Sequence, residues 1–139
     1  MKDKFTVIVD TTVWSKSFRW KKVSGRDLEV VNTLKKLAAF KQAVMIGAVR
    51  QELLSGISDG AFFNRLKAEI EEFIDYVPRT AEYELAAEFC NTCRKNGVQG
   101  SPTDFLICAI AAKNDWRIFT DDLDFPHYRD LLPIKLYEA

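Results

Sequence analysis

The sequence predicts an α/β sandwich built on a parallel sheet of four or five short strands. Two observations lead to this fold class: β-branched runs alternate with helical patterns along the whole chain, and 47% of the residues are hydrophobic, which is enough for a packed core. A chain of 139 residues and 15.9 kDa has the usual size of one domain. We therefore expect a single domain over residues 1–139.

The first half of the chain predicts two strands and three helices. Residues 5–9 form a β-branched run that is typical of a buried strand, and this strand ends at Asp10. Ser24 is a predicted N-cap of a helix, residues 43–46 form a second strand, and a short helix covers residues 49–54. Ser58 or Asp59 caps a further helix, whose apolar residues share one face: Phe62, Phe63, Leu66, Ile70, Phe73 and Ile74.

The second half continues the alternation. Residues 76–77 are a candidate minimal strand, and Thr80 caps a helix that runs to about residue 94. Ser101 and Pro102 are typical of an N-cap and a first helical residue, and the segment that follows, to about residue 114, is apolar on nearly every side, which predicts a buried helix. A strand over residues 117–120, an acidic loop, a short helix over residues 128–132 and a strand over residues 134–137 complete the chain.

The composition excludes several kinds of chemistry. His127 is the only histidine, which removes three-histidine zinc sites and two-histidine RNA cyclisation. None of the six glycines belongs to a phosphate-binding loop of the Gly-Lys-Ser/Thr type. The chain has three cysteines, and its longest apolar run is too short for a membrane, so we expect a reduced cytoplasmic protein without a membrane span. Acid–base or metal chemistry must therefore depend on carboxylates.

Charge is unevenly distributed although the formal net charge is zero. Residues 1–50 hold eleven Lys and Arg against four Asp and Glu. The excess of positive charge is greatest after the first strand, where Lys and Arg alternate with aromatic residues. Such a segment suits single-stranded nucleic acid, because basic side chains neutralise phosphates and aromatic rings stack on unpaired nucleobases. The alternative is a solvated basic surface whose aromatic residues belong to the core. The candidate RNA-binding residues are Lys16, Arg19, Trp20, Lys21 and Lys22.

Carboxylates follow the predicted strands at the points where parallel strands end. Asp10 ends the first strand, Glu52 lies in the helix after the second, and Asp104 lies in the first turn of the buried helix. Each has an ordinary alternative, such as a turn residue, a helix cap or an exposed side chain. Because sites in parallel sheets form at the carboxyl ends of strands, we expect these acids to gather there. Three further acids follow the strand at residues 117–120: Asp121, Asp122 and Asp124.

Carboxylates that lie close together repel one another, and a bound cation removes that cost. Ligands that are all oxygen select Mg²⁺ or Mn²⁺ over zinc. Such ions activate water and stabilise the charge that develops when a phosphodiester is cleaved. The residues thus predict metal-dependent phosphodiester hydrolysis.

Four segments, taken in order, resemble the PIN-domain nucleases, and among them the VapC-type toxins of toxin–antitoxin pairs. The segments are residues 7–12 (VIVDTT), 49–56 (VRQELLSG), 97–111 (ending in PTDFLICAIA, residues 102–111) and 119–125 (FTDDLDF). The resemblance implies a three-layer α/β/α sandwich and a metal-dependent endoribonuclease. It also implies a homodimer that a VapB-like antitoxin holds inactive by filling the active-site groove.

Carried over by position, the resemblance makes Asp10, Glu52, Asp104 and Asp122 the acidic quartet, with Thr12 and Thr120 as supporting hydroxyls. Asp10, Asp104 and Asp122 would hold the metal directly or through water, and Glu52 would orient a water molecule or share its proton. Asp121 and Asp124 remain alternatives for the last ligand. The substrate would be single-stranded or structured RNA. A housekeeping RNA-processing nuclease and an inert PIN-like binding domain would share these residues.

The basic segment generates a first prediction. Replacing Lys21 and Lys22 together by Ala should weaken RNA binding and flatten its dependence on salt, because each phosphate contact releases counterions. The measurement is RNA affinity at several salt concentrations. A salt slope equal to that of the wild type would remove these two lysines from the interface.

Overall fold

Five parallel strands form the centre of the computed structural model, which describes residues 6–18 and 24–139. The strands are ordered β3-β2-β1-β4-β5 across the sheet. Along the chain the elements are β1 (Val7–Val9), α1 (Thr11–Ser17), α2 (Gly25–Ala39), β2 (Ala43–Ile46), α3 (Gly47–Leu54), α4 (Gly60–Ile70), β3 (Asp75–Tyr76), α5 (Thr80–Lys95), α6 (Pro102–Asn114), β4 (Arg117–Phe119), α7 (Phe125–Leu131) and β5 (Lys135–Leu136).

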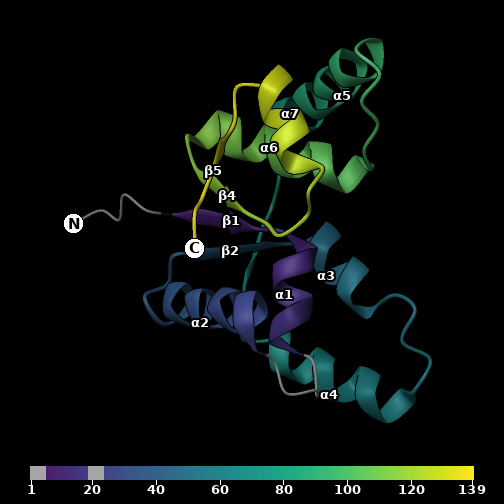
Figure 1. Cartoon of the computed structure of the whole chain (residues 1–139). Coiled ribbons are helices and arrows are strands. Elements are labelled where there is room, and N and C mark those ends of the chain that lie inside the picture. The colour runs from purple at the N-terminus through teal and green to yellow at the C-terminus, as the bar shows by residue number, and fades with distance from the viewer. Residues whose placement is uncertain (1–5, 19–23) are drawn as a thin grey trace.

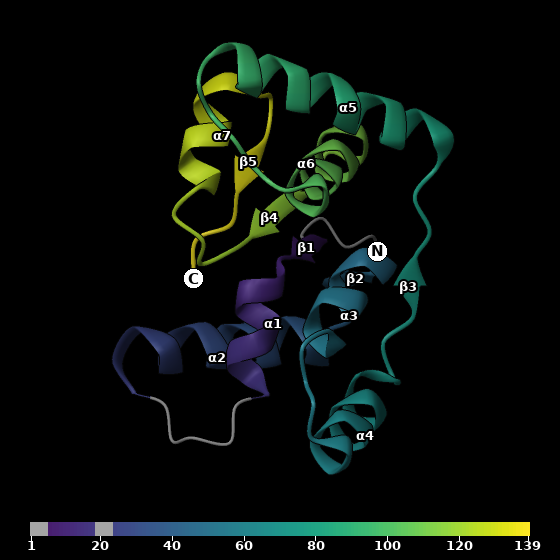
Figure 2. The ribbon, with the colours of Figure 1, turned by 90° about the vertical axis from the view of Figure 1, so that its right-hand side faces the viewer.

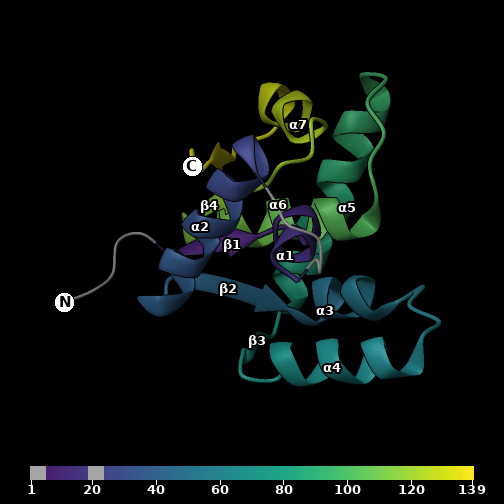
Figure 3. The same ribbon diagram turned by 60° about the horizontal axis from the view of Figure 1, so that its bottom comes forward.

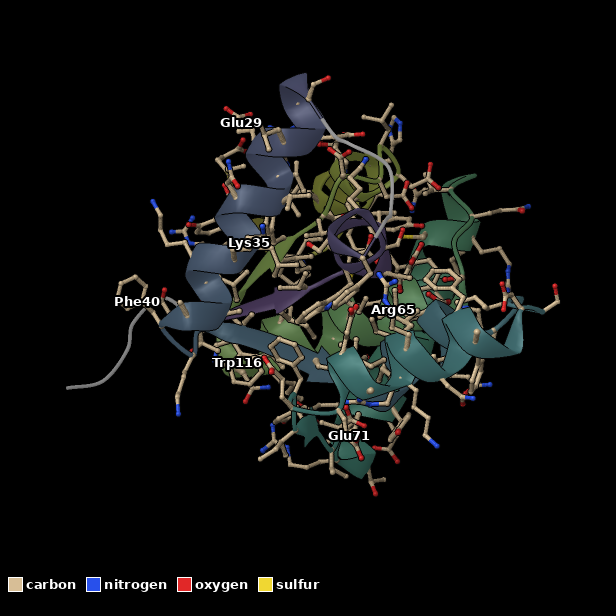
Figure 4. The ribbon with its side chains drawn as sticks, turned by 90° about the horizontal axis from the view of Figure 1, so that it is seen from below. Glu29, Lys35, Phe40, Arg65, Glu71 and Trp116 are labelled. Atoms are coloured by element: carbon tan, nitrogen blue, oxygen red, sulfur yellow. The ribbon has the colours of Figure 1, made fainter. Side chains whose placement is uncertain are left out.

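Helices cover both faces of the sheet and make three layers (Figure 1). The helices α5, α6 and α7 lie on one face and α1, α2, α3 and α4 on the other, a division that is also seen after a quarter turn in Figure 2. Figure 3 shows α4 beside α3. From below, Glu29 and Lys35 on α2 and Arg65 on α4 lie on either side of α1 (Figure 4). The predicted α/β/α sandwich with a parallel sheet is confirmed.

The core follows the apolar segments of the sequence. All three residues of β1 are fully buried, and seven consecutive residues of α6, from Phe105 to Ala111, are buried as predicted. Burying one large aliphatic side chain stabilises a fold by about 1.5–3 kcal/mol, so β1 and α6 provide much of the driving force for folding. Within the described part of the chain, no helix has both the length and the apolar character needed to cross a membrane.

The chain reverses its path across the sheet at β1. It first adds β2 and β3 on one side of β1 and then returns to add β4 and β5 on the other. The backbone N–H of Asp10 donates to the carbonyl of Phe119 at 2.9 Å, so the carboxyl ends of β1 and β4 lie next to each other. In open parallel sheets a crevice forms at such a switch point, and ligands bind there.

One helix was not predicted. The helix α1 begins at Thr11, directly after Asp10, in a segment that the sequence analysis treated only as basic and aromatic. The helix has seven residues and buries Val13 and Trp14. Two turns are too short to produce the repeating apolar pattern by which the longer helices were recognised.

Three details of the predicted helices were wrong, the first being that α7 begins at Phe125 instead of residue 128. The apolar face that starts with the cap Asp59 does not reach Ile74, because α4 ends at Ile70 and Ile74 is 91% exposed. At this end of the helix the carbonyl of Ile70 accepts hydrogen bonds from the guanidinium of Arg50 at 2.9 Å and from the backbone N–H of Phe73 at 3.1 Å. The N-cap of α5 is Arg79 instead of Thr80.

The start of α5 is anchored by a buried carboxylate. The side chain of Glu82 is fully buried, and it accepts hydrogen bonds from the Arg79 backbone at 2.7 Å, the Tyr76 hydroxyl at 2.8 Å and the Asn114 amide at 2.9 Å. Burial alone would raise the pKa of Glu82, but the hydrogen bonds from Arg79, Tyr76 and Asn114 lower it from 4.5 to about 2. Glu82 thereby joins β3, α5 and the end of α6.

This cluster predicts a pH-dependent stability. The pKa of Glu82 is lower in the folded chain than in the unfolded chain, so its contribution is complete above about pH 5 and is lost as the pH falls from 4.5 toward 2. Glu82→Gln should destabilise the protein by about 2 kcal/mol at neutral pH, and the difference should shrink in acid. Urea unfolding of both proteins between about pH 7 and pH 3 measures this.

Glu84→Gln, on an exposed position of the same helix, is the matched control and should change the unfolding free energy little at any pH. A difference between wild type and Glu82→Gln that stays constant with pH would contradict the assignment.

Candidate active site

Asp10 is the innermost carboxylate at the switch point. It follows the buried strand β1, and only 3% of its surface is exposed. Burial raises the pKa of Asp10, and hydrogen bonds from the hydroxyls of Thr12 and Thr120 work in the opposite direction. Asp10 is also the N-cap residue of α1, but its side chain makes no capping hydrogen bond. The backbone N–H groups of Thr11 and Thr12 at the start of α1 also lower the pKa of Asp10, so its carboxylate faces both the helix start and the two hydroxyls.

Two threonine hydroxyls converge on one oxygen of Asp10. The hydroxyls of Thr12 and Thr120 each donate to Asp10 Oδ2 at 2.8 Å. The same hydroxyl oxygens accept backbone N–H groups of the acidic loop, Thr12 from Asp121 at 3.1 Å and Thr120 from Asp122 at 3.0 Å. Asp10 is thus connected through two hydroxyls to the backbone of the loop that follows β4.

Asp104 lies in the first turn of α6, half-buried, and helix capping positions its backbone. The hydroxyl of Ser101 accepts the backbone N–H of Asp104 at 3.1 Å, as the predicted N-cap requires. The carboxylate itself bonds elsewhere, since the hydroxyl of Tyr128 donates to Asp104 Oδ2 at 2.7 Å. The alternative of a purely capping role for Asp104 therefore does not describe its side chain.

Three carboxylates act on one another's charge. Burial, and then the negative charges of Asp10 and Asp122, raise the pKa of Asp104 from 3.8 to about 6, while the hydrogen bond from Tyr128 opposes this shift. Such mutual repulsion is the electrostatic condition that a bound cation relieves.

The acidic loop divides its three aspartates between different partners. Asp121 Oδ2 lies 2.6 Å from Lys16 Nζ, and Asp121 Oδ1 lies 3.5 Å from Arg26 Nε. Burial raises the pKa of Asp121, but these two cations outweigh burial and lower it overall. Asp122 Oδ1 accepts the backbone N–H of Asp124 at 2.9 Å, and Asp124 is exposed. Asp121 thus pairs with cations, whereas the charge of Asp122 is one of those that raise the pKa of Asp104.

Glu52 lies on the other side of the switch point, exposed on α3. The hydroxyl of Thr11 donates to Glu52 Oε1 at 2.6 Å, which connects α3 with the start of α1. Thr11 therefore connects Glu52 to the segment that directly follows Asp10.

Of the candidate RNA-binding residues, the structure describes Lys16. Its ammonium lies 2.6 Å from Asp121 and 3.1 Å from Asp27, and its side chain is only 15% exposed. The Asp121 bond raises the pKa of Lys16. Lys16 thus neutralises two carboxylates in this structure. Arg19, Trp20, Lys21 and Lys22 lie outside the described residues.

Sequence reasoning missed two residues that touch the predicted acids, Thr11 and Tyr128. Thr11 could have been identified from its position, because a hydroxyl side chain directly after an acid that ends a strand can form a hydrogen bond with a neighbouring helix. Tyr128 had none, because its partner Asp104 is 24 positions away in the chain.

The donor set fits a hard divalent cation in its chemistry. Asp10, Asp104 and Asp122 offer carboxylate oxygens, which Mg²⁺ and Mn²⁺ prefer, and their repulsion favours a positive ion. Over residues 6–18 and 24–139, no group of three or more His, Cys, Asp or Glu side chains is gathered closely enough to form a finished metal site. Asp10, Asp104 and Asp122 are the described carboxylates that could hold the ion.

Comparison with known families decides the classification. The sequence profile described as PIN domain matches residues 7–131, a span that includes all the carboxylates of the switch point. The chain belongs to the PIN domain family. The predicted resemblance is confirmed at the level of the family.

Solved structures share this PIN fold. FitAcB from Neisseria gonorrhoeae superposes with a TM-score of 0.74 at 18% identity, covering 95% of this chain and 96% of that chain. VapBC2 from Rickettsia felis, bound to a DNA fragment from their promoter, gives 0.71 at 14% identity, with 96% and 98% covered. FitAB bound to an IR36 DNA fragment gives 0.71 at 18% identity, with 94% and 93% covered. A search of curated proteins finds no match.

The hydroxyl pair predicts a stability effect. Thr120→Val keeps the shape of the side chain but removes a donor to Asp10 and the acceptor of the Asp122 N–H, so it should destabilise the fold by about 1–3 kcal/mol. Urea unfolding measures the loss. Thr33→Val is the control, because the Thr33 hydroxyl only returns to the Glu29 carbonyl within α2. Equal losses for the two variants would show that the hydroxyl of Thr120 has no special role.

Proposed function

We propose that this PIN domain is an Mg²⁺- or Mn²⁺-dependent endoribonuclease that hydrolyses phosphodiester bonds of single-stranded or structured RNA. The observation that supports this most strongly is the position of Asp104, a half-buried carboxylate whose pKa is raised by burial and by the charges of Asp10 and Asp122 at the switch point of a parallel sheet. Membership of the PIN domain family makes nuclease chemistry the first use to test for such a cluster.

The proposed roles follow from the contacts. Asp10, Asp104 and Asp122 hold the cation, and Thr12 and Thr120 fix the carboxylate of Asp10. When bound, the cation supplies Lewis-acid activation of water and stabilises charge on the phosphate. Glu52 is exposed and accepts one hydrogen bond, from Thr11, so it has capacity left to orient the attacking water and to take its proton.

The last metal ligand is assigned to Asp122. Its neighbour Asp121 is neutralised by Lys16 and Arg26, which compete with any cation for its oxygens. The charge of Asp122 raises the pKa of Asp104, whereas Asp124 is exposed and uses its backbone N–H to hold the carboxylate of Asp122.

RNA binding is assigned to the basic segment after α1. Arg19, Trp20, Lys21 and Lys22 carry charge and an aromatic ring in a stretch without acids, and α1 begins directly after Asp10. In the sequence, only α1 and Phe18 separate this segment from Asp10. Lys16 acts on the site through Asp121 instead of contacting phosphate.

We further propose that the protein is the toxin of a VapBC-type toxin–antitoxin pair, works as a homodimer and is inhibited by a VapB-like antitoxin in the active-site groove. The support is the fold likeness to FitAcB and VapBC2, which covers nearly the whole of each chain.

Cleavage of RNA tests the enzymatic proposal. Purified protein should cleave end-labelled single-stranded RNA with Mg²⁺ or Mn²⁺ and not with EDTA. Asp104→Asn should lower the rate about 100-fold or more, because one charged ligand is lost. Asp130→Asn, on an exposed position of α7, is the control and should cleave normally. Cleavage in the presence of EDTA would contradict the metal dependence. Normal cleavage by Asp104→Asn would show that the active site does not include Asp104.

Expression in a bacterial host tests the toxin proposal. Induction of the wild-type chain should arrest growth, and Asp10→Asn, produced at the same level, should relieve the arrest. Normal growth with an active nuclease would contradict the toxin role and favour a housekeeping RNA-processing enzyme.

A further inference from the structure

Tyr128 has no place in the proposed chemistry, yet its hydroxyl points at a proposed metal ligand. The residue lies on α7 and is fully buried. A buried hydroxyl is costly unless it is hydrogen-bonded, and Tyr128 donates to Asp104 Oδ2 at 2.7 Å. The contact joins α7 to the first turn of α6, two helices on the same face of the sheet (Figure 2).

The surrounding packing fixes the direction of this hydroxyl. The rings of Phe105 and Phe125 lie 5.2 and 5.0 Å from the ring of Tyr128, centre to centre, and hold it from two sides. A Cβ atom at Gly100 would collide with the Tyr128 hydroxyl and lie 2.8 Å from its Cζ. Position 100 must therefore be glycine for the ring to reach Asp104, so three neighbours define one position of the hydroxyl.

Asp104 needs such a partner because of its neighbours. The carboxylates of Asp10 and Asp122 repel it, and without a donor its side chain would gain by turning away from them. A hydrogen bond to one carboxylate oxygen favours a single rotamer of Asp104. It leaves the other oxygen, Oδ1, free of that bond and therefore the better ligand for a cation.

We propose that Tyr128 is a positioning residue for metal binding: its hydroxyl holds Oδ2 of Asp104 and so presents Oδ1 to the divalent cation. The inference rests on the proposed function, because it takes Asp104 as a ligand. It adds a residue that touches neither the cation nor the RNA but determines how tightly the cation is held.

Calorimetric titration of the purified protein with Mn²⁺ tests the proposal. Tyr128→Phe keeps the ring and removes only the hydroxyl, and it should weaken Mn²⁺ binding about 10-fold, the usual cost of losing a hydrogen bond to a ligand. Tyr137→Phe is the matched control: it removes the hydroxyl of a tyrosine that packs on Phe119, and it should change the affinity less than about twofold.

Gly100→Ala is the second variant. It keeps both Tyr128 and Asp104 but displaces the ring, so it too should weaken Mn²⁺ binding. Thermal unfolding of each variant shows whether it is folded at the temperature of the titration. If Tyr128→Phe does not fold, Gly100→Ala decides the question, and unchanged Mn²⁺ affinity in the folded variant overturns the proposal.

Activity separates positioning from general support of the fold. With RNA as substrate, Tyr128→Phe should need about 10-fold more Mn²⁺ for half-maximal rate and recover nearly the wild-type kcat at saturating Mn²⁺. A lowered kcat with an unchanged requirement for Mn²⁺ would overturn the proposal and leave Tyr128 a structural residue. A wild-type protein that binds no Mn²⁺ would remove the proposed metal site itself, whereas binding that is equal in wild type and Tyr128→Phe would remove only the role of Tyr128.

Discussion

The convergence of two threonine hydroxyls on one buried oxygen of Asp10 is the contact on which the rest of the site depends. Thr12 lies in the helix after β1, and Thr120 lies directly after β4. The two hydroxyls therefore join the ends of β1 and β4, the strands between which the chain reverses its path across the sheet. The same hydroxyls hold the backbone of the acidic loop. Removing this contact would release Asp10 and the acidic loop together.

The site holds like charges close together, and its other residues offset the cost in different ways. Asp121 is neutralised by Lys16 and Arg26, outside the proposed metal site. Asp104 has Tyr128 as a neutral donor, which fixes the carboxylate without cancelling its charge. In the proposed site, the uncancelled charge of Asp10, Asp104 and Asp122 is what would attract a cation. This division explains why two adjacent aspartates in one loop can have different roles.

The sequence analysis predicted the fold class, the buried helix α6 and the acids that follow the strands, because these depend on local patterns of apolar residues and caps. It missed α1, whose two turns carry no repeating pattern, and it placed Ile74 on a buried face because the contact of Arg50 with the carbonyl of Ile70, at the end of α4, joins residues 20 positions apart. The role of Lys16 and the contact of Tyr128 with Asp104 depend on residues far apart in the chain, 105 and 24 positions respectively, and no local pattern contains them.

The central claim is that the charges of Asp10, Asp104 and Asp122 form one cation site from which the paired Asp121 is excluded. The most direct test is calorimetric titration with Mn²⁺ of Asp122→Asn and Asp121→Asn, two neutral isosteres at adjacent positions of one loop. Asp122→Asn should weaken binding about 10-fold or more, and Asp121→Asn should change it less than about threefold. The reverse order, or equal losses, would contradict the account.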